Sequence, residues 1–549
     1  MIWRVLGTCR LAICVIDAIG ELNFVHPALQ STWRGSGGRA THILRRTLPA
    51  GLAVVAVCGL VSLLYVINPL VGMVSLAGAL ALWVLVRNHF WSILAVYASI
   101  SLGVLGLITS DSTLTVTKLL IALAAIIWLV RTLFYKETDA FIETLRNPAI
   151  HMSIVLTFIV YLSIFNAHDS GFAIYFFAKF ASLCGVFYLV VLAIRTERQL
   201  YAVIRTVILC AAIVSLGGVY EMVTQRSVHR LFGREQYLAV GREGGGRLTS
   251  RHQSGYVAPT LETQKGAWVR VQSTFNDPNT FSAYLLSAIA LSLAAFLGAE
   301  KRRDKWLYAA ALLPLVLSLL GTGSRASLGL LGLVVLIYFL HLPFRNKFAA
   351  VAIAAGSLTV VISALVILMP QFRKGISIDA FRDDPRYGLW TMAIHMIADH
   401  PWMGVGYGNF IDLYSQYRVP GAPGLLQPMP HNSFLQIWAE TGTLGAAAAL
   451  GFVLLIVWQL WVVMRNTKDR KRWFTALALT GAVVGYFLNS LTIPMLDDQS
   501  LWLTAALGVA GTSVLRAGLA SEQSRWGSSV SLAGESTSPA EDRGLAKSR

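Results

Sequence analysis

Long apolar runs are the feature of this sequence that most restricts its fold. A helix needs about 20 mostly apolar residues to cross the hydrocarbon core of a membrane, and runs of that length recur along the chain. Hydrophobic residues make up 55% of the 549 residues and charged residues only 13%, whereas about a quarter of residues are charged in soluble domains. Backbone in lipid must satisfy its own hydrogen bonds, so the runs predict helices. The expected fold class is therefore all-α, a polytopic helical membrane protein, and soluble enzymes and disordered chains are excluded.

The apolar runs predict about 14 transmembrane helices, within a range of about 12 to 14. The candidate spans are 48–66, 70–86, 90–109, 114–134, 149–166, 172–194, 200–220, 279–298, 306–321, 326–343, 348–369, 443–464, 473–492 and 499–515. The resulting organisation is an N-terminal segment 1–47, N-terminal transmembrane helices 48–220, a first long loop 221–278, central transmembrane helices 279–369, a second long loop 370–442, C-terminal transmembrane helices 443–515 and a disordered tail 516–549.

Basic residues in the short loops orient these helices. The chain has 45 lysines and arginines against 28 acidic residues, a net charge of +17, which is also a property of nucleic-acid-binding proteins. The charges lie in short loops between apolar runs, which favours membrane orientation and argues against a nucleic-acid partner. With the N-terminus in the cytoplasm, the cytoplasmic short loops hold seventeen Lys and Arg residues and the outer ones hold only Arg325. Both termini are expected inside, and both long loops outside.

Two basic residues stand apart from this distribution. Arg325 lies in Thr322-Gly323-Ser324-Arg325-Ala326 at the outer end of a span, where it could bind an anionic substrate or contact anionic lipid. Lys179 lies inside a span, about two turns from its outer end. It could reach a pyrophosphate at the outer surface, or it could pair with Asp169 or a backbone carbonyl, and such pairing is slightly favoured.

The second long loop contains a predicted helix followed by a glycine-rich turn. Asp384 and Pro385 are typical of a helix start, and apolar residues recur after them at helical spacing. Arg386 lies in the first turn of this helix, either as a phosphate contact or as an ordinary surface arginine. Alternating glycines in Gly404-Val405-Gly406-Tyr407-Gly408 then indicate a tight loop in which backbone segments approach closely. A structural role is favoured over phosphate binding because no strand precedes the loop.

His431 precedes another short helix, which Gly442 is expected to end. Asn432 or Ser433 can cap this helix. The free N–H groups at a helix N-terminus favour an anion and disfavour a protonated imidazole. His431 could therefore accept a proton from a sugar hydroxyl, and a capping or structural histidine is the alternative.

A third outer element leads into the span 279–298. It consists of Arg270 and, further on, Asn276-Asp277-Pro278-Asn279, for which a capping role is favoured. The sequence contains no Walker motif, no His-Glu-x-x-His and no Cys/His cluster with zinc spacing. The adjacent pairs Asp383-Asp384 and Asp497-Asp498 are weak metal candidates. No metal or other cofactor is expected, so a departing phosphate would have to be neutralised by arginine.

Taken in order, these motifs resemble the O-antigen ligase and O-antigen (surface polysaccharide) polymerase superfamily of bacterial membrane glycosyltransferases. The resemblance covers about residues 270–450 and includes Thr322-Gly323-Ser324-Arg325-Ala326, Arg386-Tyr387-Gly388-Leu389-Trp390 and the His400–Phe410 loop. Its most specific part is His431-Asn432, then nine residues, then Gly442-Thr443-Leu444-Gly445. Members of the family commonly have fewer spans than are counted here, so an extra pair is expected near the N-terminus.

The resemblance implies a GT-C-like enzyme that performs metal-independent, inverting glycosyl transfer at the periplasmic face of the bacterial inner membrane. The donor would be a glycan on undecaprenyl pyrophosphate, and the acceptor would be lipid A core for a ligase or a growing glycan chain for a polymerase. Membrane lipids complete the expected partners. The residues themselves are compatible with this reaction: the predicted catalytic residues are His431, Arg325 and Arg386, and the predicted substrate-binding residues are Arg270, Lys179, Asn432, Asn279 and Glu440. Glu440 is also the next candidate for the base.

A polytopic flippase or transporter of lipid-linked glycans is the alternative function. It predicts ionisable residues through the middle of the helix bundle and a site reachable from both sides. The polar residues singled out above gather instead on the outer side, which favours the enzyme.

Overall fold

The computed structural model describes residues 88–103, 115–135, 144–232, 270–341, 386–420 and 429–535, with a few isolated positions. The chain divides into two compact units, Met1–His89 and Phe90–Arg549, and nearly all described residues belong to the second. The predicted spans 48–66 and 70–86, and most of 348–369, lie outside the described residues, as do Asp383, Asp384 and Pro385.

The second unit is a bundle of helices, and no β-strand occurs in the part of the chain that the structure describes. Its elements are α4 (Phe90–Ile100), α5 (Val116–Tyr135), α7 (Pro148–Leu162), η3 (Ser163–Asn166), α8 (Ser170–Ala193), α9 (Glu197–Thr224), α10 (Val228–Leu231), α12 (Pro278–Gly298), α13 (Arg302–Gly321), α14 (Arg325–His341), α18 (Arg386–Asp399), α19 (Phe410–Leu413), α20 (Ser433–Asn466), α21 (Arg470–Ser490) and α22 (Gln499–Glu535). Nine of the described helices are long and apolar enough to cross a membrane. The expected all-α polytopic membrane fold is confirmed.

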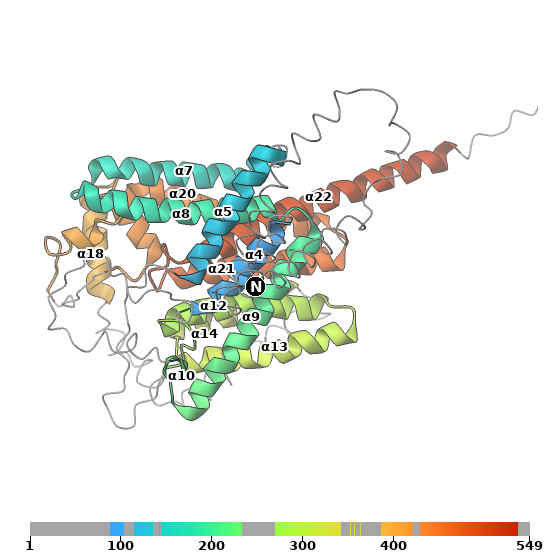
Figure 1. The fold of residues 1–549 in the computed structure, drawn as a ribbon, viewed down its shortest axis with the longest axis horizontal. Coiled ribbons are helices and arrows are strands. Elements are labelled where there is room, and N and C mark those ends of the chain that lie inside the picture. Colours follow the sequence, from blue (N-terminus) through green and yellow to red (C-terminus); the bar gives the residue numbers. More distant parts are fainter. Residues whose placement is uncertain are drawn as a thin grey trace, which may run out of the picture. The chain divides into compact units, whose positions relative to one another are not determined.

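Helix α12 is the most deeply buried of these spans. Of its most apolar stretch 78% is buried, against 17% for α5. It packs against α9, α13, α14 and α21, and its interior face is rich in Ala and Ser, which let neighbouring helices approach closely. Elsewhere in the bundle, α7 packs along α8 and α20, and α18 lies at one end, beside α20 (Figure 1).

Local sequence signals set several helix starts. The Asp169 side chain accepts a hydrogen bond from Phe172 N and caps α8, and Asp277 accepts from Thr280 N and caps α12, with Pro278 in its first turn. Each side chain satisfies a backbone donor that the helix leaves without an intrahelical partner. The capping role expected for the Asn276–Asn279 element is therefore confirmed at Asp277.

Two predicted boundaries are wrong. The span expected over 90–109 ends as a helix at Ile100, because the chain turns at Gly103, whose φ is +49° and whose hydrogen faces the Thr274 backbone. The tail expected to be disordered from 516 is helical as far as Glu535, as the continuation of α22. The sequence has no proline between 516 and 535, and extending an existing helix avoids the cost of nucleating a new one.

Gly442 interrupts α20, as the sequence predicted for the end of a short helix. Its φ of 71° and ψ of −174° are non-helical and belong to a region that only glycine adopts readily. A side-chain Cβ at this position would also overlap the carbonyl of Trp402. The helix resumes immediately, so the short N-terminal piece that carries the Asn432 cap is set at its own angle to the rest of α20.

Replacing Gly442 with alanine is therefore expected to reduce the amount of folded protein severely. The backbone strain alone should cost about 1–3 kcal/mol. The added Cβ would also clash with backbone atoms of Trp402 and Met403, which cannot move aside as a flexible side chain could. The measurement is thermal unfolding in detergent together with the yield of monodisperse protein. Gly185→Ala is the matched control, since Gly185 lies on α8 with no atom within 4 Å of the added Cβ. An unchanged melting temperature for Gly442→Ala would contradict the prediction.

Candidate active site

Arg270 joins the starts of two helices that carry predicted site residues. Its Nε donates to the carbonyl of Thr322 at 2.8 Å, and its Nη2 donates to Asn279 Oδ1 at 2.8 Å. Thr322 follows α13 and leads into Arg325, and Asn279 lies in the first turn of α12. The guanidinium is thus fixed between the two segments. In this structure the Asn279 side chain accepts a hydrogen bond from Arg270 and so helps to position it.

The three predicted arginines come together. Arg325 is the first residue of α14 and is exposed, and Arg386 is the first residue of α18 and is half-buried. Burial lowers the pKa of Arg270, the Asp277 carboxylate opposes this effect, and the positive charges of Arg386 and Arg325 lower the pKa further. Arg325 and Arg386 are therefore each near enough to Arg270 to repel its guanidinium group. Such a cluster attracts a polyanion, which would relieve the repulsion.

His431 is tied to the same end of α18. The indole N–H of Trp390 donates to the carbonyl of Pro430 at 2.8 Å, directly before His431. Arg386 and Trp390 are four residues apart on one helix, so their side chains lie on the same face. The hydrogen bond therefore brings the arginine face of α18 to the histidine.

The backbone around His431 is held from two further directions. Asn432 caps α20 by accepting from Phe434 N and Leu435 N, each at 3.0 Å. Ser433 Oγ donates to Ile493 O at 3.0 Å and accepts from Met495 N at 2.8 Å, which fixes the helix start to the connection between α21 and α22. His431 has a positive φ of 50°, a conformation that costs a non-glycine residue about 1–3 kcal/mol and occurs at functional sites. The predicted place at a helix N-terminus is confirmed, and Asn432 serves there as the cap.

Lys179 has a protein partner other than the one expected. Its Nζ lies 2.8 Å from Asp497 Oδ2, with the two side chains 29% and 28% exposed. The suggested pairing with Asp169 is wrong, because that side chain caps α8. The Lys179–Asp497 pair joins α8 to the α21–α22 connection, which also holds the start of α20.

Glu440 is buried beneath the glycine-rich turn. Only 1% of it is exposed, so its carboxyl is shielded from solvent. The backbone of the turn is hydrogen-bonded to α20 here. Val405 N donates to Ala439 O and Gly406 N donates to Glu440 O, both at 2.9 Å. These contacts fix the turn to the backbone of α20 and do not involve the Glu440 carboxyl.

Close backbone packing explains the alternating glycines. Gly404, Gly406 and Gly408 have φ of +65°, +96° and +82°, which side-chain-bearing residues rarely adopt. Added Cβ atoms would collide with the α20 backbone, with Ala167 and with Phe176 respectively. The turn thus lies against both α20 and the η3–α8 connection, as a close-packed structural loop would.

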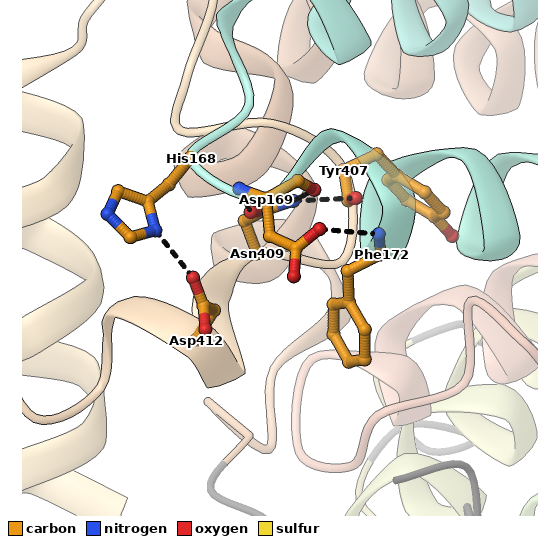
Figure 2. A network of polar contacts seen from close by, with 6 residues as sticks. All are labelled: His168, Asp169, Phe172, Tyr407, Asn409 and Asp412. Atoms are coloured by element: carbon orange, nitrogen blue, oxygen red, sulfur yellow. Dashed lines mark hydrogen bonds and ion pairs between the residues drawn. The ribbon is translucent and has the colours of Figure 1, made fainter.

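A polar network that sequence patterns did not indicate fixes this turn to the start of α8 (Figure 2). Asn409 Oδ1 accepts from Asp169 N at 2.8 Å, and Asn409 Nδ2 donates to Asp169 O and Tyr407 O, both at 3.4 Å. His168 Nδ1 lies 2.6 Å from Asp412 Oδ2 at the exposed edge. These contacts join positions about 240 residues apart, and no local motif announces them.

Candidate metal ligands do not gather in the described ranges: no group of three or more His, Cys, Asp or Glu side chains there could hold an ion. Of the acidic pair Asp497-Asp498, the first carboxylate is engaged with Lys179. The second accepts a hydrogen bond from Ser500 N at 2.6 Å.

Comparison with known proteins bears on the part of the chain that holds this site. Residues 309–450 match the family model described as O-Antigen ligase. A curated O-antigen ligase of Pseudomonas aeruginosa (strain PAO1) is 31% identical over 181 residues, which is 32% of this chain and 39% of that relative. The chain therefore matches less than half the length of this relative. The family match includes Arg325, Arg386 and His431, so the segment of the chain that holds these residues is similar to O-antigen ligases.

Proposed function

We propose that this protein is a glycosyltransferase that moves an oligo- or polysaccharide from undecaprenyl pyrophosphate to an acceptor sugar hydroxyl. We place the reaction at the periplasmic face of the inner membrane. The observation that supports this most is the convergence of Arg270, Arg325 and Arg386 beside the His431 segment. Clustered arginines suit a pyrophosphate, and an imidazole suits a hydroxyl proton.

In the proposed reaction the acceptor hydroxyl oxygen attacks the anomeric carbon from the face opposite the pyrophosphate. The new C–O bond forms as the bond from that carbon to the phosphate oxygen breaks, so the configuration inverts. His431 accepts the hydroxyl proton, and the lipid pyrophosphate departs with the bonding electron pair. Negative charge grows on the leaving oxygen, so arginines held there lower the barrier without a metal ion.

An apolar pocket beside the site supports a lipid-linked donor. It lies between α20, α21 and α22, and its lining includes Ser433, Phe434, Phe452, Tyr486 and Trp502. Ser433 and Phe434 follow His431 within three residues. A hydrocarbon chain in this pocket would therefore keep the attached pyrophosphate near the arginines.

The direct test is transfer by purified protein in nanodiscs, supplied with a lipid-pyrophosphate glycan and an acceptor glycan. We expect two products: the donor glycan joined to a hydroxyl of the acceptor glycan, and free undecaprenyl pyrophosphate. Movement of the donor between leaflets without any product would favour the flippase instead.

The acceptor can be identified in a deletion strain. Polymer that is still made, together with undecorated lipid A core, would mark a ligase. Single repeat units that are transferred without polymer would mark a polymerase.

Topology is a separate prediction, which rests on the distribution of Lys and Arg in the short loops. Reporter fusions at Gly245 and Pro423 are expected to read outside, and fusions at Arg303 and Lys468 inside. The measurement is the activity of paired reporters that fold in only one compartment. A cytoplasmic signal from Pro423 would put His431 on the wrong side and overturn the proposed mechanism.

A further inference from the structure

Glu221 is a buried carboxylate near the end of α9 that collects three backbone N–H groups. Its side chain is 0% exposed. Oε1 accepts from Val228 N at 2.8 Å, and Oε2 accepts from Gln272 N at 2.8 Å and Ser273 N at 2.7 Å. A buried carboxylate is stable only when such donors replace its hydration. One side chain thus joins the chain after α9 to the segment before α12.

The segment that Glu221 holds, 270–274, is irregular and depends on contacts with other elements. Val271 N donates to Gly321 O at 3.0 Å, Ser273 Oγ to Val214 O at 2.8 Å, and Thr274 Oγ1 to Ser101 O at 2.7 Å. Ser273 has a positive φ of 50°, which a serine adopts only when its surroundings fix it. The two N–H bonds to Glu221 lie at the centre of this arrangement.

Arg270 is two residues before Gln272, at the start of the same segment. A guanidinium group has five N–H donors. Two of those of Arg270 donate hydrogen bonds to Thr322 O and Asn279 Oδ1. The remaining donors can serve a phosphate only if the backbone presents Arg270 at one fixed place. We infer that Glu221 is a positioning residue, which holds Arg270 toward the donor pyrophosphate through the backbone of Gln272 and Ser273. The inference rests on the proposed function, in which Arg270 contacts the donor.

Glu221→Gln tests this inference while it keeps the side-chain shape. The amide places N–H groups against backbone donors, so at least one of the three hydrogen bonds is lost. We expect the KM for the lipid-pyrophosphate donor to rise about 10-fold while kcat changes by no more than about 3-fold. Glu197→Gln is the matched control: Glu197 begins α9, at its other end, and pairs with Arg472 at 2.6 Å. The control should leave the donor KM unchanged.

A double-mutant cycle with Arg270→Lys shows whether Glu221 acts through Arg270. We expect the donor KM of the double variant to be no higher than that of the more impaired of the two single variants. Effects that multiply would mean that Glu221 acts independently of Arg270, and the inference would fall. If Glu221→Gln does not accumulate, Glu221→Asp replaces it in the same cycle, since it keeps the charge and withdraws the carboxyl by one methylene.

Hydrogen exchange gives a readout that does not depend on activity. In Glu221→Gln the amides of 270–274 should exchange faster than in the wild type, while those of α20 stay unchanged. Unchanged exchange at 270–274 would overturn the inference even if the protein is an active transferase. Faster exchange in a protein that shows no transfer with any lipid-pyrophosphate donor would keep the positioning of Arg270 but reject the proposed function.

Discussion

Replacing His431 with alanine is expected to lower the rate of glycan transfer by about 100-fold or more, while the protein stays folded and still binds donor. The donor already has a good leaving group, so the base need only accept a proton as the hydroxyl attacks. The residues on either side hold the His431 backbone in place. The Pro430 carbonyl accepts a hydrogen bond from the Trp390 indole, and the Asn432 side chain caps α20. Because these contacts use backbone and neighbouring side chains, removal of the imidazole should leave them intact.

The comparison requires transfer and donor binding to be measured separately on purified protein in nanodiscs. His395→Ala is the matched control, since His395 is an exposed histidine on α18. If His431→Ala loses donor binding in step with turnover, the imidazole is a donor contact and the base lies elsewhere. If it keeps both, the histidine serves only the local structure.

Sequence patterns predicted the features that depend on short stretches of chain. Apolar runs located most of the membrane-spanning helices that the structure describes, and side chains such as Asp277 and Asn432 marked helix starts because a cap acts within three residues. The distribution of loop charges placed Arg270, Arg325 and Arg386 on the same outer side, but no local rule relates positions so far apart, so the sequence could not show that they form one cluster. The structure brings them together by placing the starts of α12, α14 and α18 at one end of the bundle.

Contacts between distant segments could not be predicted in the same way. The Lys179–Asp497 pair joins residues 318 positions apart, and the nearer Asp169 was the natural choice from sequence alone. The alternating glycines indicated close backbone approach but not the partners, which are Ala167, Phe176 and α20. Glu221 is a lone acidic residue after an apolar run, and its local sequence indicates no role because that role depends on the distant Gln272 and Ser273.

The second large effect is expected at Arg325 and Arg386. Alanine at either position should lower transfer by about 100-fold, because one fixed donor to the developing charge is lost. Lysine keeps the charge but lacks the planar fork that binds two phosphate oxygens, so a loss of about 10-fold should remain. The lysine variants should therefore keep more activity than the alanine variants. The difference between them measures the attraction of the donor by positive charge, and the remaining loss in the lysine variants measures direct binding by the guanidinium group.

Arg302→Lys is the matched control for these variants. Arg302 is also the first residue of its helix, α13, and is exposed, but it lies at the far end of that helix from Thr322 and the site. If the arginines bind pyrophosphate, raising the salt concentration should weaken donor binding in the wild type more than in the alanine variants, since fewer charges remain to be screened. Near-normal transfer by both Arg325→Lys and Arg386→Lys, at wild-type protein levels, would show that these arginines contact lipid or solvent. The leaving group would then have to be neutralised by other residues.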